Sequence, residues 1–386
     1  MAKMNENFLN LKQNYLFIEI GKRVREFIAA NPDAPLIRMG IGDVTLPLSP
    51  CVVEAGKKAF DEMGVKETFR GYEDSGRGYD FLREAIAGYY KTFGATIAAD
   101  EIFISDGAKS DSGNISDIFS ADCPVIVTDP AYPVYVDSNI MAGRQVAFTD
   151  FVGSTAPETV AKDSLIYLCS PNNPTGQAYT YDELKKWVDL AIKTDSIIIY
   201  DAAYESFITE KDKPRSIFLI EGARNCAIEI CSLSKTAGFT GTRCGYTIVP
   251  NELEKIKSTW ARRQSTKFNG VSYPVQRAAE AVFSEEGQRQ TKEATAYYQA
   301  NTKIMMTALT ELGIDFTGGI NSPYVWFKCP KGMDSWEFFD VLLGKANVVG
   351  TPGVGFGKNG DGWFRLTGFN TRENTEEAMR RLRNIL

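Results

Sequence analysis

Short apolar strands alternate with stretches of helical periodicity between about residue 100 and residue 250. The expected strands are Ile102–Ser105, Val125–Thr128, Leu165–Cys169, Ile197–Tyr200, Ala227–Cys231 and Tyr246–Val249. One intervening helix has a clear start, because Thr180 and Glu183 form a capping box before an apolar helical face. This alternation predicts an α/β fold in which a mainly parallel sheet lies between helices.

Polar, turn-forming residues directly follow five of these strands. The segments are Asp106–Lys109, Asp129–Tyr132, Ser170–Gly176, Asp201–Tyr204 and Ser232–Lys235. Each segment alone is ordinary as a helix cap or an Asx turn. Ligands of open α/β sheets bind beyond the carboxyl ends of the strands, so five such segments together predict one shared site.

The segment Ser232–Gly245 indicates the chemistry of that site. It places Lys235 between small hydroxyl residues and continues to Arg243. Hydroxyl groups and a guanidinium bind phosphate, and a lysine amine forms a Schiff base with an aldehyde. A loop of this composition is usually a solvated turn, but the other strand-end segments favour a site. An aldehyde that carries a phosphate is pyridoxal phosphate, which we expect as the cofactor.

Composition excludes several classes of protein. The sequence contains no histidine, which removes Ser-His-Asp triads, Cys-His pairs and histidine-ligated metals; we expect no metal site. A net charge of −6 without a long basic run argues against nucleic-acid binding. No apolar run reaches the length of a membrane span. The seven cysteines have no C-x-x-C spacing, which is typical of reduced thiols in a cytoplasmic protein.

Pyridoxal phosphate needs several features from its protein, and the strand ends offer candidates for them. Lys235 is the candidate imine-forming amine and acid/base catalyst. Asp201 follows a buried Ile-Ile-Ile-Tyr strand and suits the anion that faces the pyridine nitrogen. Tyr132 is the candidate aromatic plate against the ring, and Asn173 and Tyr204 are candidate donors to the phenolic oxygen.

The same reasoning predicts where the two anionic groups bind. The expected phosphate cup consists of Ser232, Ser234, Arg243 and the backbone at Gly107, Ala108 and Lys109, where a helix begins. Arg365, after a glycine-rich loop, is a candidate clamp for the substrate α-carboxylate or a surface arginine. Gly355–Gly360 matches G-x-G-x-x-G, but it precedes a strand, so we interpret it as a decoy for dinucleotide binding.

A chain of 386 residues is long enough for two domains. Long helices are expected from about 275 to 312, followed by short strands around Tyr324–Lys328 and Gly362–Leu366. We predict an N-terminal arm and part of a small domain at 1–47, a large cofactor-binding domain at 48–285, and a smaller α+β domain at 286–386. A helix over Ile18–Ala30 is expected to pack on the small domain.

These residues together resemble a known family. The matching elements, in chain order, are Tyr72, Gly107–Lys109, Asp-Pro-x-Tyr132-Pro, Asn173-Pro-Thr-Gly, Asp201-x-x-Tyr204, Ser232-x-Ser-Lys235, Arg243 and Arg365. Their order resembles the pyridoxal-phosphate-dependent aminotransferases of class I/II, fold type I. The resemblance implies a large domain with a mainly parallel seven-stranded sheet. It also implies a homodimer with shared active sites, in which Tyr72 of one subunit reaches the phosphate bound by the other.

Within that family the chain is similar to the LL-diaminopimelate aminotransferases. The matching stretches are Asn14–Phe17, Ile104–Lys109, Cys169–Gly176, Phe239–Gly241 and Thr266–Gly270. The resemblance implies transfer of an amino group between LL-2,6-diaminopimelate and 2-oxoglutarate in lysine synthesis. It adds substrate contacts from Tyr15, Gly42, Lys109, Tyr132, Asn173 and Asn269 to that of Arg365, with Asn269 from the partner subunit.

One segment departs from the pattern of this group. The group has Gly-x-Glu-Gln-Gly after the tyrosine, with a glutamate that recognises the distal end of the substrate, whereas Gly71–Gly78 has different residues and one more of them. Glu73 and Asp74 are both candidates for that carboxylate. The open alternatives are an aromatic, alanine or aspartate aminotransferase, or a C–S lyase. A third hypothesis is a non-catalytic regulatory module. It would require a fused DNA-binding segment or the loss of the imine-forming lysine, and the sequence shows neither.

Overall fold

The computed structural model describes residues 2–11, 16–150 and 156–386. Its largest unit is a seven-stranded sheet with the order β2-β8-β7-β6-β5-β3-β4. The strands are β2 (Ile102–Ser105), β3 (Val125–Asp129), β4 (Val146–Asp150), β5 (Leu165–Cys169), β6 (Ile197–Asp201), β7 (Ala227–Ser232) and β8 (Gly245–Ile248). Only β8 is antiparallel to its neighbours in this sheet. The predicted α/β class is confirmed.

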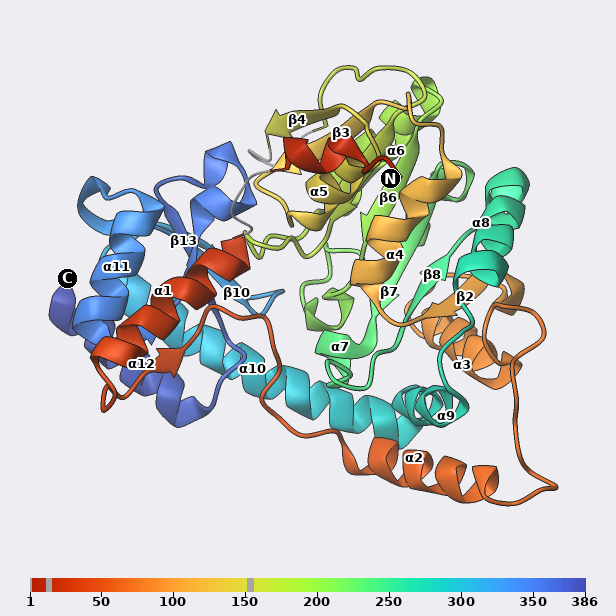
Figure 1. Cartoon of the computed structure of the whole chain (residues 1–386), viewed down its shortest axis with the longest axis horizontal. Helices are drawn as coiled ribbons and strands as arrows, with labels where there is room; N and C mark the ends of the chain where they lie inside the picture. Colours follow the sequence, from red (N-terminus) through yellow and green to blue (C-terminus); the bar gives the residue numbers. More distant parts are fainter. Residues whose placement is uncertain (1, 12–15, 151–155) are drawn as a thin grey trace.

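Helices cover both faces of this sheet (Figure 1). Those of the large sheet and its surroundings are α2 (Pro50–Met63), α3 (Asp80–Lys91), α4 (Ala108–Asn114), α5 (Val134–Met141), α6 (Tyr181–Lys193), α7 (Leu233–Thr236), α8 (Glu254–Lys267) and α9 (Tyr273–Val282). Successive residues of β5 alternate between two hydrophobic clusters, Ile166 in one and Tyr167 in the other. Since both faces are buried, the strands read as continuous apolar runs in the sequence.

The capping box predicted for α6 is present. The Thr180 hydroxyl accepts a bond from the Glu183 N–H at 3.2 Å, and the Glu183 carboxylate accepts one from the Thr180 N–H at 2.7 Å. The helix then buries Leu184, Trp187 and Val188 against the sheet. Satisfying both backbone groups fixes where α6 begins, and so fixes the length of the Ser170–Gly176 turn before it.

A second sheet is antiparallel and has the order β12-β13-β10-β9. Its strands are β9 (Phe316–Gly318), β10 (Tyr324–Lys328), β12 (Thr351–Pro352) and β13 (Trp363–Thr367). The helices α1 (Leu16–Ala30), α10 (Glu285–Glu311), α11 (Ser335–Ala346) and α12 (Arg372–Ile385) pack on it around a separate core. In Figure 1 the long helix α10 runs from this part to the end of α9 beneath the large sheet.

The N-terminal segment is part of this second unit. β1 (Ile37–Arg38) pairs in parallel with β11 (Val348–Val349), and Leu16, Ile20 and Val24 of α1 belong to the core of the small sheet. The domain limits at 47 and 285 stay a prediction. In the part of the chain that the structure covers, none of the helices combines the length and the apolar character that a membrane span requires.

Candidate active site

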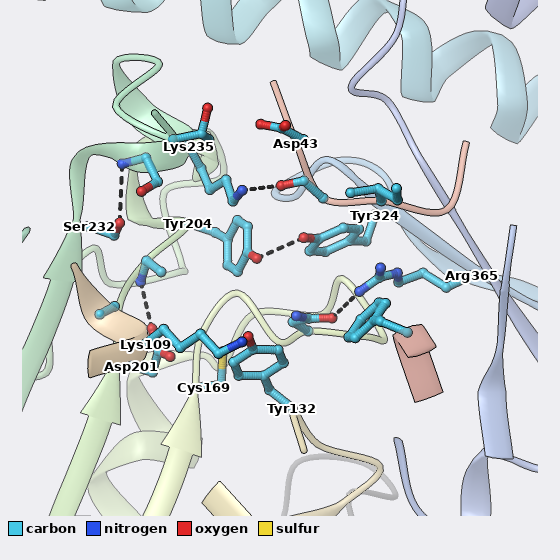
Figure 2. Close-up of a pocket in the computed structure, with 18 of the residues that line it drawn as sticks. Asp43, Lys109, Tyr132, Cys169, Asp201, Tyr204, Ser232, Lys235, Tyr324 and Arg365 are labelled. Atoms are coloured by element: carbon cyan, nitrogen blue, oxygen red, sulfur yellow. Dashed lines mark hydrogen bonds between the residues drawn. The ribbon is translucent and has the colours of Figure 1, made fainter. Parts of the chain in front are cut away.

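One cavity of about 470 Å³ lies where the parallel strands of the large sheet end. It brings together most of the residues that the sequence singled out, and the side chains labelled in Figure 2 surround a common space. Those residues are Gly42, Ala108, Lys109, Tyr132, Asn173, Asp201, Tyr204, Ser232, Ser234, Lys235, Arg243 and Arg365. The five strand-end segments therefore form one site, for the reason that parallel strands share one carboxyl edge.

Lys235 reaches the cavity from the short helix α7, which begins directly after β7. Ser232 caps this helix, and its hydroxyl accepts a bond from the Ser234 N–H at 3.1 Å. The ammonium Nζ of Lys235 donates to the carbonyl oxygen of Gly42. Burial lowers the pKa of Lys235 to about 8, and the neighbouring Asp43 opposes this change. The amine is thus neutral more often than an exposed lysine is, which makes it a better nucleophile.

Asp201 is the buried anion at the end of β6. Its Oδ2 accepts a bond from the Tyr135 hydroxyl at 2.6 Å, and its Oδ1 accepts one from the Ala203 N–H at 2.9 Å. Burial raises the pKa of Asp201, whereas these two donors lower it. Both of these donors are neutral groups, so a cationic nitrogen placed in the cavity would meet a carboxylate that neither donor neutralises.

A set of anion-binding donors lies on the β7 side. Arg243 donates from Nη1 to the Ser234 hydroxyl at 3.1 Å, and its Nη2 lies close to Gly107. A Cβ on Gly107 would come within 2.6 Å of that nitrogen, and the φ of +133° also favours glycine there. The helix α4 begins one residue later, at Ala108. Hydroxyls and a guanidinium at this end suit a phosphate group.

Arg365 forms the opposite wall and comes from strand β13 of the small sheet. It is 1% exposed, so the surface-arginine alternative is wrong. Its Nη1 donates to Asn173 Oδ1 and its Nη2 to the Gly40 carbonyl at 2.7 Å. The guanidinium carbon also lies 4.3 Å from the ring centroid of Tyr324. Its Nε has no hydrogen-bond partner among the described residues, so the side chain retains capacity for a carboxylate.

Tyr135, Tyr324 and Asp43 line the cavity but had no part in the sequence-based prediction of the site. Tyr135 lies three residues after Tyr132, in the first turn of α5, and this spacing was a usable signal. Tyr324, at the start of β10, shares a hydrogen bond of 2.7 Å between its hydroxyl and that of Tyr204. A Cβ on Gly42 would lie 2.4 Å from the same Tyr324 hydroxyl. Asp43 follows Gly42 and lines the cavity opposite Lys235 (Figure 2).

Two other predicted residues that the structure describes, Tyr72 and Asn269, lie outside the cavity. Tyr72 is 81% exposed and Asn269 is also exposed, and neither lines the cavity of the single chain. Tyr15 lies outside the described residues. The carboxylate of Glu73 accepts bonds from the backbone N–H groups of Ser75, Arg77 and Gly78 at 2.7 to 3.1 Å. Glu73 therefore stabilises its own loop.

Comparisons with known proteins agree with this geometry. The family described as aminotransferase class I and II matches residues 34–382. The chain is 54% identical to an LL-diaminopimelate aminotransferase of Lachnospira eligens, over 100% of both chains. It is 51% identical to one of Methanosphaera stadtmanae, over 100% of this chain and 99% of the other.

Solved structures give the same result. The L,L-diaminopimelate aminotransferase of Chlamydomonas reinhardtii superimposes with a TM-score of 0.91 at 39% identity, covering 99% of this chain and 98% of that one. An aspartate aminotransferase of Thermus thermophilus superimposes with a TM-score of 0.86 over 100% of both chains. At 22% identity, this second match supports the fold alone.

We expect Tyr135→Phe to weaken cofactor binding and to shift the acidic limb of the pH–activity profile to higher pH. The variant removes a donor that lowers the pKa of Asp201, so the carboxylate is protonated, and loses its hold on the ring nitrogen, at a higher pH. A hydrogen bond to a charged group contributes about 1.5–3 kcal/mol, which predicts roughly a 10-fold or greater loss of pyridoxal phosphate affinity.

The measurements are cofactor titration of the apo-protein and kcat/KM against pH. Tyr167→Phe is the matched control, because Tyr167 stacks on Tyr135 with ring centroids 5.3 Å apart, but its hydroxyl has no hydrogen-bond partner among the described residues. Identical profiles for wild type and Tyr135→Phe would show that this hydroxyl does not tune the carboxylate.

Proposed function

Because this chain belongs to the aminotransferase class I and II family, we propose that it transfers an amino group between LL-2,6-diaminopimelate and 2-oxoglutarate. It is a pyridoxal-phosphate-dependent transaminase. The other substrate pair is tetrahydrodipicolinate and glutamate, and the reaction serves lysine synthesis. The observation that carries the proposal is the single cavity in which Lys235, Asp201 and Arg365 meet.

The donor set of the cavity fits pyridoxal phosphate. Ser232, Ser234 and Arg243 form the anion-binding end, and Asp201 is a buried carboxylate that accepts hydrogen bonds from two neutral donors. A protonated pyridine nitrogen beside Asp201 would stabilise both charges. When bound, the cofactor supplies an aldehyde that condenses with amines and a ring that withdraws electrons from the substrate α-carbon.

Lys235 provides the amine and the proton transfer. Its pKa of about 8 leaves a larger fraction of Nζ neutral near physiological pH than an exposed lysine has, so this residue would supply the amine for the aldehyde and the base for the proton of the substrate α-carbon. The Gly42 carbonyl orients Nζ within the cavity. Ser206 and Thr236, whose hydroxyls lie 3.0 Å apart, join the segment after β6 to α7 and support this position.

Arg365 and Asn173 orient the substrate. The guanidinium is held between the Gly40 carbonyl, the Asn173 amide and the Tyr324 ring, so its direction is fixed before substrate enters. A carboxylate paired with it places the α-carbon toward Lys235. Tyr204 would donate to the phenolic oxygen of the cofactor. Its hydroxyl shares a hydrogen bond with that of Tyr324, which would then be the donor and complete the hydrogen bonds of Tyr204.

Recognition of the distal end of diaminopimelate is assigned to Lys109, Tyr15 and Asn269, and to an acidic side chain of the Gly71–Gly78 loop. Glu73 already accepts three backbone bonds within the loop. Asp74 is exposed, so the proposal gives the recognition role to Asp74. With the extra residue, the loop would still supply a recognition carboxylate, one position later in the sequence than in the Gly-x-Glu-Gln-Gly pattern.

The proposal includes a homodimer whose two sites are shared. Exposed apolar side chains gather after α2, with Val65 49%, Phe69 57% and Tyr72 81% exposed. Apolar groups of this size are typical of a surface that another protein covers, and Tyr72 has no part in the cavity of its own chain. All seven cysteines are free, which fits the reducing cytoplasm that we propose as its location.

Lys235→Arg should abolish turnover and the visible absorbance of the bound cofactor. A guanidinium cannot serve as the amine nucleophile because it stays protonated. The measurements are the absorbance spectrum of the reconstituted protein and the turnover rate with glutamate. Lys257→Arg, which changes a lysine outside the cavity, is the control and should behave as wild type. Full activity of Lys235→Arg would remove the proposed chemistry.

LL-diaminopimelate should convert the bound cofactor to its pyridoxamine form in a single turnover faster than aspartate, alanine or phenylalanine does. The reason is that the site's polar groups for the distal end stay unpaired with shorter substrates. Rapid-mixing absorbance measures the four rates, with glutamate as the partner substrate for the reverse half-reaction. Conversion by phenylalanine without conversion by diaminopimelate would establish the aromatic alternative instead.

Mixing two impaired variants, at a cofactor concentration too low to saturate Tyr72→Phe, tests the shared sites. Tyr72→Phe should weaken cofactor binding, and Lys235→Arg should eliminate the amine. If Tyr72 serves the partner's site, a mixed dimer contains one site with both native residues, so activity returns after the subunits are dissociated and re-associated. No recovery, with mixed dimers demonstrated by mass spectrometry, would place Tyr72 outside the partner's site.

A further inference from the structure

The glycine-rich loop Gly353–Gly360 has no part in the function described above. It forms two short turns, η10 (Gly353–Phe356) and η11 (Lys358–Gly360), and leads into β13, the strand that carries Arg365. We interpret its G-x-G-x-x-G pattern as a false match to a dinucleotide-binding motif, and the sequence suggests no other role for it. In the structure the loop lies against the carboxyl end of β3 in the large sheet.

The side chain of Asp129, the last residue of β3, enters this loop. It is 6% exposed. Its Oδ2 accepts a bond from the Lys358 N–H at 3.1 Å, and both of its oxygens lie 3.3 Å from the Asn359 N–H. Gly357 allows this approach, because its φ is +140° and a Cβ there would lie 1.9 Å from Asp129 Oδ1. The loop therefore binds an anion, which is a carboxylate of the same chain.

A second bond joins the same two segments. The Ala131 N–H donates to the Phe356 carbonyl at 2.8 Å. Tyr132, which lines the cavity, is the next residue after Ala131. On the other side, the Phe356 ring centroid lies 4.8 Å from the guanidinium carbon of Arg365. These contacts link the segment that carries Tyr132 to the residues that back Arg365.

We propose that Asp129 is a positioning residue for the substrate. Its carboxylate holds the Gly353–Gly360 loop on the large sheet, and so fixes the separation between Tyr132 at the cofactor side and Arg365 at the carboxylate side. The proposal rests on the proposed role of Arg365 in binding the α-carboxylate. Breaking the link would leave a buried carboxylate with fewer donors, so the linked arrangement is strongly favoured over a loose one.

Asp129→Asn in the holoenzyme tests the proposal. The asparagine side chain carries no charge. It also replaces one of the two acceptor oxygens with an NH2 group, which cannot accept a bond from a backbone N–H. We expect KM for both the amino acid and the 2-oxo acid to rise roughly 10-fold or more, with the pyridoxal phosphate affinity within about two-fold of wild type. Asp150→Asn is the matched control. Asp150 pairs with Asp129 in register but is exposed, and among the described residues it accepts a bond from the Asn359 side chain at 2.6 Å and none from the loop backbone.

Hydrogen exchange supplies a readout without substrate. The Lys358 and Asn359 amides should exchange faster in Asp129→Asn than in wild type or Asp150→Asn, as measured by mass spectrometry of a peptide that spans them. Gly357→Ala approaches the same contact from the loop side and should give the same two effects. It keeps the test open if Asp129→Asn does not fold.

Two results would overturn the inference: an unchanged KM in folded Asp129→Asn and Gly357→Ala, or a loss of cofactor affinity as large as the loss of substrate affinity. Arg365→Lys separates this failure from that of the proposed function. An unchanged KM in Arg365→Lys overturns the role of Arg365 and this inference with it. A raised KM there, beside an unchanged KM in Asp129→Asn, overturns this inference alone.

Discussion

The charge of Asp201 is the constraint on which the active site depends. Asp201 is the last residue of β6. It lies in register with Cys169 of β5 on one side and Ile230 of β7 on the other, so neighbouring strands flank it on both sides. Burial raises its pKa, and the Tyr135 hydroxyl and a backbone N–H oppose this effect. A cation beside it would gain more than it would in water, because the surroundings have a low dielectric constant. In the proposed function, this carboxylate would therefore decide where a pyridine nitrogen binds and which way the ring faces.

The second sheet supplies what the large sheet lacks. Arg365 and Tyr324 come from adjacent antiparallel strands, in which Trp326 pairs with Arg365 and Tyr324 with Thr367. The Tyr204–Tyr324 hydrogen bond and the Arg365–Asn173 contact cross from one sheet to the other at the cavity itself. The distance between cofactor and carboxylate sites therefore depends on how the two sheets are held together.

The sequence predicted the buried part of the fold well. Six strands of the large sheet agree within one residue at each end, because buried parallel strands have continuous apolar runs. The edge strand β4 (Val146–Asp150) was missed, since its side chains are mostly exposed and no apolar run marks it. The strand-end segments predicted the cavity for the same reason: strand ends are visible in the sequence, and parallel strands bring them together.

Contacts between distant segments could not be predicted. Tyr324 pairs with a residue 120 positions earlier, and no local pattern distinguishes it from a core tyrosine. Asp129 was part of a predicted strand-end segment, but its partner is the backbone of a loop more than 200 residues away. Tyr72 and Asn269 are exposed in the single chain, so their roles depend on the resemblance to the family and stay predictions.

The charges that line the cavity are opposite to those of the whole protein. The net charge is −6, but the lining includes the cations Lys109, Lys235, Arg243 and Arg365 and the carboxylates Asp43 and Asp201. Such a local field attracts anionic ligands whatever the total charge is. After burial and against the effect of Asp43, both arginines lower the pKa of Lys235. A phosphate near Arg243 and a carboxylate near Arg365 each offset one of these repulsions. The pKa of Lys235 would therefore be lowest in the empty cavity and would rise as anionic ligands bind beside the two arginines.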